Sequence, residues 1–335
     1  MPSFERESGR IVIAGASSLL GAELRSLLEE SRFAGADFRL VDEEIAAGVL
    51  TEAGGEPAVI QPVEAETFER ASKIFFAGSP EFTIANLRAA RKTSAKVMDL
   101  SGATAAQDGT VSWFPKLDAL LDREFPGGAG SYAVPSAGGM MASALSLGLH
   151  KVGVSRMVVF CFQPVSDVGK AGIEELESQT GQLLSFQGVG QPVFDTQVAF
   201  NLLDRYGPES KHRLSAIRER LAAEVKGCVG GNSIFPALQI IQAPVFYGTA
   251  FAAWAEIAPE TSLAQVIEAC ENAGFAIDSS AATGPSNVSV AGEKIAHLAK
   301  PEKDASRAGT WWFWGAADNI RLPAANAVRL AEMFS

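Results

Sequence analysis

The sequence predicts an α/β protein in which a doubly wound parallel sheet is joined to a second, α+β domain. Two observations support this fold class. Over roughly the first 130 residues, a usual domain size, short β-branched runs alternate with helical patterns. After a Gly- and Pro-rich stretch at 125–130, the expected strands are separated from the helices instead. The length of 335 residues is itself a prior for about two domains.

Each element of the first domain follows from a local pattern. Short apolar runs predict buried parallel strands at 11–14, 38–41, 74–77 and 96–99. A helix is predicted after the first run, because leucines recur on one of its faces, at Leu20, Leu24, Leu27 and Leu28. A second helix is predicted over 82–91. Strands that alternate with helices in this way are typical of a doubly wound sheet.

The second domain is predicted from the remaining patterns. Strands are expected at 157–162, 238–241 and 251–257. A helix over 169–184 has one side formed by Ile173, Leu176, Thr180, Leu183 and Leu184. A second helix is expected over 211–225, and its inward-facing residues are Leu214, Ile217, Leu221 and Val225. An open sheet needs covering, and a homodimer would cover it.

The chain is expected to finish with a helix over 324–334 that returns to the first domain. The predicted boundaries are therefore residues 1–132 together with 318–335 for the first domain, and residues 133–317 for the second.

Composition excludes several classes of protein. With Lys+Arg 28 and Asp+Glu 39, the net charge is −11, which argues against binding to nucleic acid. The first residues lack the apolar core of a secretory signal, and no run is long enough to cross a membrane, so a cytoplasmic protein is expected. The three cysteines and three histidines share no ligand spacing, so no metal site is predicted.

The turn after the first strand is a candidate phosphate-binding loop. A Rossmann-type dinucleotide site has glycines here, because the pyrophosphate approaches the backbone at the start of a helix. The middle glycine of the motif is replaced by Ser18, whose Cβ crowds that approach. The alternative is a structural turn that binds nothing. The candidate cofactor-binding residues are Gly15, Ser17, Ser18, Leu19, Leu20 and Gly21.

Asp42 stands at the tip of the second predicted strand. An acid in this place accepts hydrogen bonds from the adenosine ribose of NAD and repels the 2′-phosphate of NADP. Asp42 therefore favours NAD over NADP if a cofactor binds. The alternative is a solvated acidic turn, since Glu43 and Glu44 follow directly.

A second candidate site is the segment around Ser136, which precedes the predicted helix that carries Leu145 to Leu149. No histidine lies nearby in the sequence to activate the Ser136 hydroxyl, so a helix N-cap is favoured over a nucleophile. Tyr132, Tyr247 and Ser136 are candidate proton donors that the sequence does not rank.

Four motifs in the same order give the chain a resemblance to a known family. They lie at 15–21 (GASSLLG), 98–103 (MDLSGA), 162–169 (FQPVSDVG) and 315–328 (GAADNIRLPAANAV). The chain resembles the aspartate-semialdehyde dehydrogenase family, which is related to N-acetyl-glutamyl-phosphate reductase. The resemblance implies a nicotinamide cofactor, NAD or NADP, with Asn319 among the residues that bind it. It also implies a homodimer formed through the second domain.

Carried over residue by residue, the family's catalytic set is absent. Ala137 stands at the position of the cysteine that attacks the acyl phosphate, Gln242 at that of the substrate-binding arginine, and Thr249 at that of the acid/base histidine. An alanine forms no thioacyl intermediate, and threonine does not shuttle protons near neutral pH. The arginine expected shortly after the fourth strand is missing from 101–104. Gln163, which orients the acyl group in the family, is retained.

Three further residues have weaker interpretations. Glu209 and Lys211 are placed loosely like a substrate-contacting pair. Cys161 is near Gln163 in sequence but lies within an apolar strand, so a buried structural thiol is favoured over a relocated nucleophile.

The leading hypothesis is a catalytically degenerate member of this family that acts as a binding or partner protein, for example with an active paralogue. The alternative is an active NAD(P)-dependent semialdehyde dehydrogenase or other oxidoreductase with rearranged catalytic residues and its own small-molecule substrate.

Overall fold

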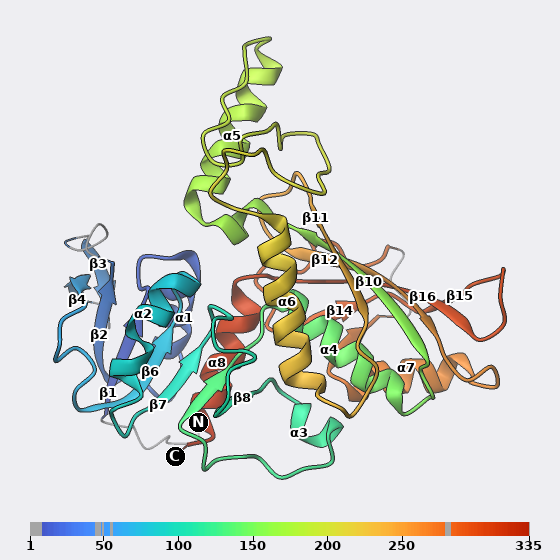
Figure 1. The fold of residues 1–335 in the computed structure, drawn as a ribbon, viewed down its shortest axis with the longest axis horizontal. Coiled ribbons are helices and arrows are strands. Elements are labelled where there is room, and N and C mark those ends of the chain that lie inside the picture. The colour runs from blue at the N-terminus through green and yellow to red at the C-terminus, as the bar shows by residue number, and fades with distance from the viewer. Residues whose placement is uncertain (1–8, 44–47, 49, 54–55, 279–282, 335) are drawn as a thin grey trace. The chain divides into compact units, whose positions relative to one another are not determined.

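The computed structural model describes residues 9–43, 48, 50–53, 56–278 and 283–334. The chain forms two compact units, drawn in Figure 1. Unit 1 consists of Met1–Pro115, Glu124–Ser136 and Pro323–Ser335, and unit 2 of Lys116–Arg123 and Ala137–Leu322. None of the helices in the described part of the chain is long and apolar enough to cross a bilayer.

Unit 1 contains a seven-stranded sheet in the order β5-β2-β1-β6-β7-β9-β8, and all its strand pairs are parallel. The four predicted strands are confirmed as β1 (Arg10–Ala14), β2 (Asp37–Asp42), β6 (Ala71–Phe76) and β7 (Lys96–Asp99). Five short strands were not predicted, namely β5 (Gln61–Pro62), β8 (Thr110–Ser112), β9 (Ser131–Ala133) and the hairpin of β3 (Leu50–Ala53) with β4 (Glu56–Val59).

Helices cover both faces of this sheet, because buried parallel strands are apolar on both sides. In β1, Ile11 and Ile13 pack with the buried leucines of α1 (Leu19–Glu29). Val12 and Ala14 point to the other face and pack with Phe82 and Leu87 of α2 (Pro80–Ala90). Both predicted helices are thus confirmed, and the sheet is doubly wound.

The last helix, α8 (Arg321–Glu332), completes the core of unit 1. Its buried residues join the cluster formed by β1 and α1, and they include Ala324, Ala327, Val328 and Leu330. The C-terminal helix therefore packs with elements from the start of the chain within unit 1.

Unit 2 is built on a mixed sheet in the order β11-β10-β12-β16-β14-β13, with β15 paired to β16. The predicted strands are confirmed as β10 (Arg156–Gln163), β11 (Ala237–Gln242) and β12 (Thr249–Glu256). The strands that were not predicted are β13 (Phe275–Ile277), β14 (Ala296–Leu298), β15 (Glu302–Lys303) and β16 (Thr310–Ala317). β10 pairs with β11 in parallel and with β12 antiparallel.

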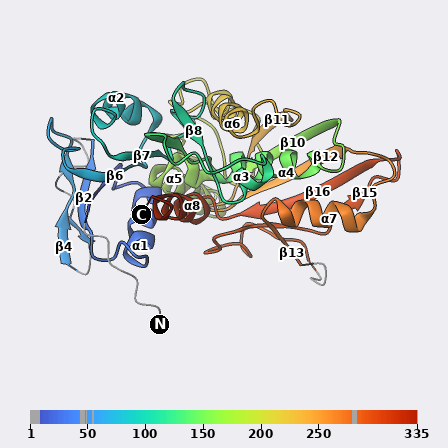
Figure 2. The same ribbon diagram turned by 90° about the horizontal axis from the view of Figure 1, so that it is seen from below.

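The central helix of unit 2 is α4 (Ala137–His150), in which every residue except His150 is buried. It contacts β10 and β12 and also packs against α6 (Leu214–Val229) and α7 (Leu263–Asn272), as Figures 1 and 2 show. Gly148 permits the close approach of α7, because a Cβ there would lie 2.8 Å from the main-chain oxygen of Ala269. The short helix α3 (Leu117–Leu120) belongs to the same unit.

Helix α5 (Lys170–Leu184) confirms the predicted helix but not an apolar buried side. Its buried residues are Gly172, Glu175, Leu176 and Gln179, whereas Leu184 is 70 % exposed. Gln179 accepts hydrogen bonds from the N–H groups of Val198 and Ala199, and its amide donates to the main chain at Gly190 and Thr196. The helix therefore binds the loop that follows it through amide hydrogen bonds, because that loop supplies main-chain groups as partners.

Candidate functional site

The loop between β1 and α1 lies where the strand order of the parallel sheet reverses, since β2 and β6 flank β1 on opposite sides. Ligands of doubly wound folds bind at this carboxyl edge. Gly15 has a φ of +92°, and a Cβ there would lie 2.1 Å from the nitrogen of Gly78. A Cβ at Gly21 would lie 2.2 Å from the oxygen of Gly15. The first and last glycines of the motif are thus required by the packing of the turn itself.

Ser18, at the middle position of the motif, is the N-cap of α1. Its hydroxyl accepts a 2.8 Å hydrogen bond from the N–H of Gly21 and donates one of 2.8 Å to the oxygen of Ala77. The N–H groups of Leu19 and Leu20 belong to the first turn of the helix and have no acceptor within it. They are the donors that this turn can offer to a pyrophosphate.

Asp42 ends β2 and is only 7 % exposed, so it is not part of a solvated turn. Its Oδ2 accepts a 2.8 Å hydrogen bond from the N–H of Ser17, and its Oδ1 accepts one of 2.9 Å from the N–H of Glu43. The carboxylate thus connects the strand tip to the glycine-containing turn. Because each carboxylate oxygen has two acceptor positions, Asp42 retains capacity for a ribose hydroxyl. The residues of this edge fit a dinucleotide.

The first turn of α4 begins at Ala137, which is 1 % exposed and carries no reactive group. The next residue, Gly138, shows what lies against the first turn of this helix. A Cβ at Gly138 would lie 3.5 Å from Leu221, 3.6 Å from Sγ of Cys161 and 3.9 Å from Cγ2 of Thr249. The structure therefore brings Cys161 of β10 and Thr249 of β12 close to the first turn of α4.

The thiol of Cys161 lies near the first turn of α4, but it is held in its neutral form. Burial raises the pKa of Cys161 to about 12, and the negative charges of Glu224 and Asp167 add to the effect. A thiol with such a pKa is not a nucleophile at neutral pH. The interpretation of Cys161 as a structural residue is consistent with this environment.

Gln242 is fully buried and all its polar groups are paired. Its Nε2 donates to the main-chain oxygens of Gln163, at 2.9 Å, and of Ala243, at 2.7 Å. Its Oε1 accepts a 2.7 Å hydrogen bond from the hydroxyl of Tyr206. The side-chain amide of Gln242 therefore already has hydrogen-bond partners within the protein for both its oxygen and its nitrogen.

Gln163 belongs to a polar cluster whose centre is Asp167, in the 3₁₀ turn η2 (Val165–Val168). The Asp167 carboxylate accepts hydrogen bonds from Nε2 of Gln163 and, at 2.6 Å, from Nδ2 of Asn319. Oδ1 of Asn319 accepts a 2.8 Å hydrogen bond from the N–H of Gly248. Asn319 thus connects η2, the turn before β12 and the residues before α8, all within unit 2.

The environment of Asp167 disfavours the charged form of its carboxyl group. Burial raises the pKa of Asp167, and the positive charge of Arg220 together with the bonds from Asn319 and Gln163 partly offsets this. Asp167 and Arg220 were not predicted as site residues. A buried acid within the motif at 162–169 is the signal that points to Asp167, whereas nothing in the sequence indicates that Arg220 of α6 lies near it.

The remaining candidates are dispersed. Glu209 and Lys211 are exposed, and the main-chain N–H of Glu209 donates to Asp195. The contacts of the polar cluster include neither of them. Tyr132 is fully buried in unit 1 and its hydroxyl donates to the oxygen of Pro126, whereas Tyr247 is 44 % exposed in unit 2. Of the two tyrosines among the proton-donor candidates, Tyr247 is the more accessible to solvent.

Among residues 9–43, 48, 50–53, 56–278 and 283–334, no group of three or more His, Cys, Asp and Glu side chains is arranged to hold a metal ion.

Family models match both parts of the chain. Residues 10–135 match the NAD binding domain of semialdehyde dehydrogenases, and residues 147–322 match their dimerisation domain. The chain is similar to the USG-1 protein homologue of Azotobacter vinelandii, with 27 % identity over 328 residues that cover 96 % of both chains. It is also 24 % identical to an aspartate-semialdehyde dehydrogenase of Rickettsia bellii over 331 residues, again 96 % of both.

Solved structures show the same fold. Aspartate semialdehyde dehydrogenase II of Vibrio cholerae, in a complex with ASA, has a TM-score of 0.85 and 24 % identity, and the similarity covers 98 % of both chains. The enzyme of Candida albicans with NADP has a TM-score of 0.68 and 13 % identity, covering 97 % of this chain and 98 % of that one. The chain belongs to the semialdehyde dehydrogenase family and has both of its domains, the NAD binding domain and the dimerisation domain.

Proposed function

We propose that this protein binds a nicotinamide dinucleotide, NAD in preference to NADP, but does not carry out the phosphorylating semialdehyde dehydrogenase reaction. The observation that supports this most directly is the buried Ala137 at the start of α4, where the family resemblance requires a cysteine. A methyl group attacks no carbonyl carbon, so a thioacyl intermediate has no place to form.

The neighbouring residues do not replace the missing groups. Cys161 is close to the start of α4, but burial keeps its pKa at about 12. Thr249 has no basic group to accept a proton near pH 7. Gln242, at the arginine position, is paired to Tyr206 and to the main chain, and it lacks the charge and planar fork that bind a carboxylate. Loss of all three functions together supports an inactive site.

Cofactor binding is supported by the carboxyl edge of the parallel sheet. The N–H groups of Leu19 and Leu20 would hold the pyrophosphate, and Asp42 would accept a hydrogen bond from the adenosine ribose. The negative charge of Asp42 would repel a 2′-phosphate, which favours NAD. When bound, the nicotinamide would supply a hydride acceptor, and the residues of the chain would only bind and orient it.

The proposal includes a homodimer formed through one face of the unit 2 sheet. This face carries the partly exposed rings of Phe160, Trp312 and Trp314, at 38 %, 47 % and 40 % exposure. The indole N–H of Trp312 donates to Asp304 and that of Trp314 to the oxygen of Pro285. Because these donors are already paired within the chain, the rings can be covered by a second subunit without losing a hydrogen bond.

The test combines an activity assay with a binding assay on the purified protein. Aspartate semialdehyde, phosphate and either NAD or NADP should give no more reduced cofactor than a heat-killed control. NAD should raise the melting temperature more than NADP does, because a ligand at 100 times its dissociation constant adds about 2.7 kcal/mol of stability. Phosphate-dependent turnover would refute inactivity, and a melting temperature unchanged by both nucleotides would refute cofactor binding.

A second candidate function is an oxidoreductase with rearranged catalytic residues, favoured by the exposure of Tyr247 in unit 2. Hydride transfer to a carbonyl needs a positioned nicotinamide and a proton donor but no thiol. Saturable oxidation of NADH with a carbonyl compound, lost in Tyr247→Phe, would establish this function. No turnover over a panel of aldehydes and ketones would leave the binding role.

A partner role would fit an inactive member of the family. The proposed partner is an active paralogue in the cytoplasm, bound through the same sheet face as in the homodimer. Co-expression of the two chains with different tags tests this, since mixed dimers support the partner role and homodimers alone exclude it.

A further inference from the structure

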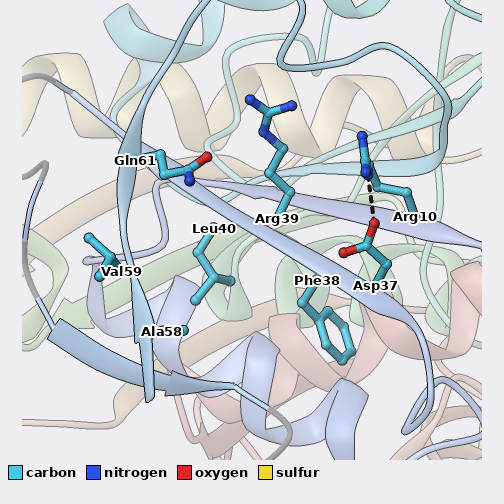
Figure 3. Close-up of a pocket in the computed structure, with 8 residues that line it drawn as sticks. All are labelled: Arg10, Asp37, Phe38, Arg39, Leu40, Ala58, Val59 and Gln61. Carbon is cyan, nitrogen blue, oxygen red and sulfur yellow. Dashed lines mark hydrogen bonds and ion pairs between the residues drawn. The ribbon is translucent and has the colours of Figure 1, made fainter. Parts of the chain in front are cut away.

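A cavity of about 260 Å³ lies at the edge of the unit 1 sheet, between β2 and β4 (Figure 3). Arg10 and Asp37, which open β1 and β2, both line it. They mark the amino ends of these parallel strands, whereas the Gly15–Gly21 turn and Asp42 follow the carboxyl ends. The cavity is therefore separate from the edge proposed to bind the dinucleotide.

Among the residues that the structure describes, one wall of this cavity is a part of β2 whose outer edge pairs with no other strand. On the side of β2 away from β1, β5 pairs only with Val41 and Asp42. The preceding residues of β2 line the cavity together with Ala58 and Val59 of β4. Main-chain groups of a strand that has no neighbour can bind a ligand. The walls thus combine main-chain polar groups with short apolar side chains.

The charged residues of the cavity do not cancel. Nε of Arg10 and Oδ2 of Asp37 form an ion pair at 2.8 Å, which neutralises both. Arg39 lines the same cavity, and within the described part of the chain its guanidinium has no hydrogen bond or ion pair. Figure 3 shows its side chain extending from β2 on the side opposite to Phe38 and Leu40. One unpaired positive charge therefore remains.

Arg39 also has a buried donor with no acceptor. Its Nε is buried and makes no hydrogen bond with the residues that the structure describes. Nε of Arg25 and Nε of Arg32 are also buried and make no hydrogen bond with the described residues. These two guanidinium groups, however, donate through Nη, that of Arg25 to Thr51 and that of Arg32 to the main-chain oxygen of Glu332. A buried donor without a partner is unfavourable for the folded state.

We propose that this cavity binds a small carboxylate with a short apolar body, held by Arg39. The guanidinium matches a carboxylate, with which it forms two parallel hydrogen bonds. The amide of Gln61, also in the wall, offers further donors, and Ala58 and Val59 contact the apolar part. The volume of about 260 Å³ is below the range of about 300–1,000 Å³ that is usual for ligand sites, so the ligand is much smaller than a dinucleotide.

The test measures dissociation constants of 4-methylpentanoate, its neutral amide and inorganic phosphate by ligand-observed NMR on the full-length protein. The carboxylate should bind at least about tenfold more tightly than the amide, because hydrogen bonds between two charged groups are stronger than those to a neutral amide. Equal binding of carboxylate and amide, or no binding of the carboxylate at millimolar concentration, would overturn the proposal. Tighter binding of phosphate would overturn the choice of a carboxylate.

Variants locate the binding. Arg39→Gln should weaken 4-methylpentanoate about tenfold or more, whereas Arg39→Lys should lose less, because it keeps the charge but not the planar fork. Arg88→Gln removes the same charge from the exposed side of α2 and should bind as the wild type does. An undiminished affinity in Arg39→Gln, in a sample that unfolds like the wild type, would place the ligand elsewhere. Asp42→Ala should bind 4-methylpentanoate as the wild type does. This result would show that the ligand is not bound at the edge proposed for the dinucleotide.

Discussion

The hydroxyl of Tyr206 donates a 2.7 Å hydrogen bond to Oε1 of Gln242, and both side chains are buried. Tyr206 belongs to the segment between α5 and α6, and Gln242 ends β11. The bond therefore ties a long connection to the sheet of unit 2. The resemblance would place a substrate-binding arginine at position 242, whereas the amide of Gln242 is hydrogen-bonded to Tyr206 and to the main chain.

Tyr206→Phe should lower the free energy of unfolding by about 1–3 kcal/mol, because it leaves a buried acceptor of Gln242 without a partner. Urea unfolding followed by circular dichroism measures the change. Tyr247→Phe is the matched control, since Tyr247 is 44 % exposed and should change stability by less than about 0.5 kcal/mol. Equal stability of the two variants would contradict a structural role for the bond.

The thiols should be unreactive in the native protein. Burial raises the pKa of Cys161 and of Cys270 to about 12, and Cys228 is also buried. At pH 8 a thiol of that pKa is ionised in about one molecule in ten thousand. Ellman's reagent should therefore label almost no thiol before unfolding and all three cysteines in guanidinium chloride. Rapid labelling of Cys161 in the native state would reopen its interpretation as a nucleophile.

Uninterrupted apolar runs could be predicted as strands from the sequence, whereas the very short strands and the eight-residue β16 could not. Buried parallel strands are continuous apolar runs, so β1, β2, β6 and β7 stand out. Strands of two or three residues, such as β5 and β9, carry too few side chains to show a period. The sheet edge that bounds the cavity near Arg39 could not be predicted from the sequence for the same reason.

Candidate site residues could be named from the sequence where they lie within one motif. The spacing of glycines predicts the turn at 15–21 as a candidate site, and motif positions predict Ala137 and Thr249 as site positions, and these stay predictions. Asp167 and Arg220 come from η2 and α6, and only the fold brings them together. The polar buried side of α5 was missed because apolar periodicity does not register Glu175 and Gln179, which bind the following loop.

Ser18 should limit cofactor affinity through its Cβ rather than its hydroxyl. Ser18→Ala and Ser18→Gly both remove the helix cap, and the alanine variant should lose about 1 kcal/mol of stability. Only the glycine variant also removes the Cβ that crowds the turn. We expect Ser18→Gly to bind NAD several-fold more tightly than Ser18→Ala in isothermal titration calorimetry. Identical affinities would show that the Cβ does not obstruct the dinucleotide.

The proposed dimer should depend on the aromatic face of the sheet. Trp312→Glu places a charge among the rings of Phe160 and Trp314, where a second subunit would leave it buried and unpaired. Sedimentation analysis should then show monomers at concentrations where the wild type is dimeric. Ile84→Glu makes the same kind of change at an exposed residue of α2 and should remain dimeric. A dimeric Trp312→Glu would place the interface elsewhere.

The partly buried Asp167 should make stability depend on pH. Its pKa is raised by burial above the ordinary value of 3.8, so the native state retains a proton that the unfolded chain loses above about pH 4. The free energy of unfolding should therefore fall as the pH rises from that value through the raised pKa. Asp167→Asn cannot titrate, so the fall should be smaller in urea unfolding measured over this range. Asp122→Asn alters an exposed acid and should keep the wild-type slope. If Asp167→Asn kept that slope too, the pH dependence would have to arise from other groups, among them Glu175, whose pKa burial also raises.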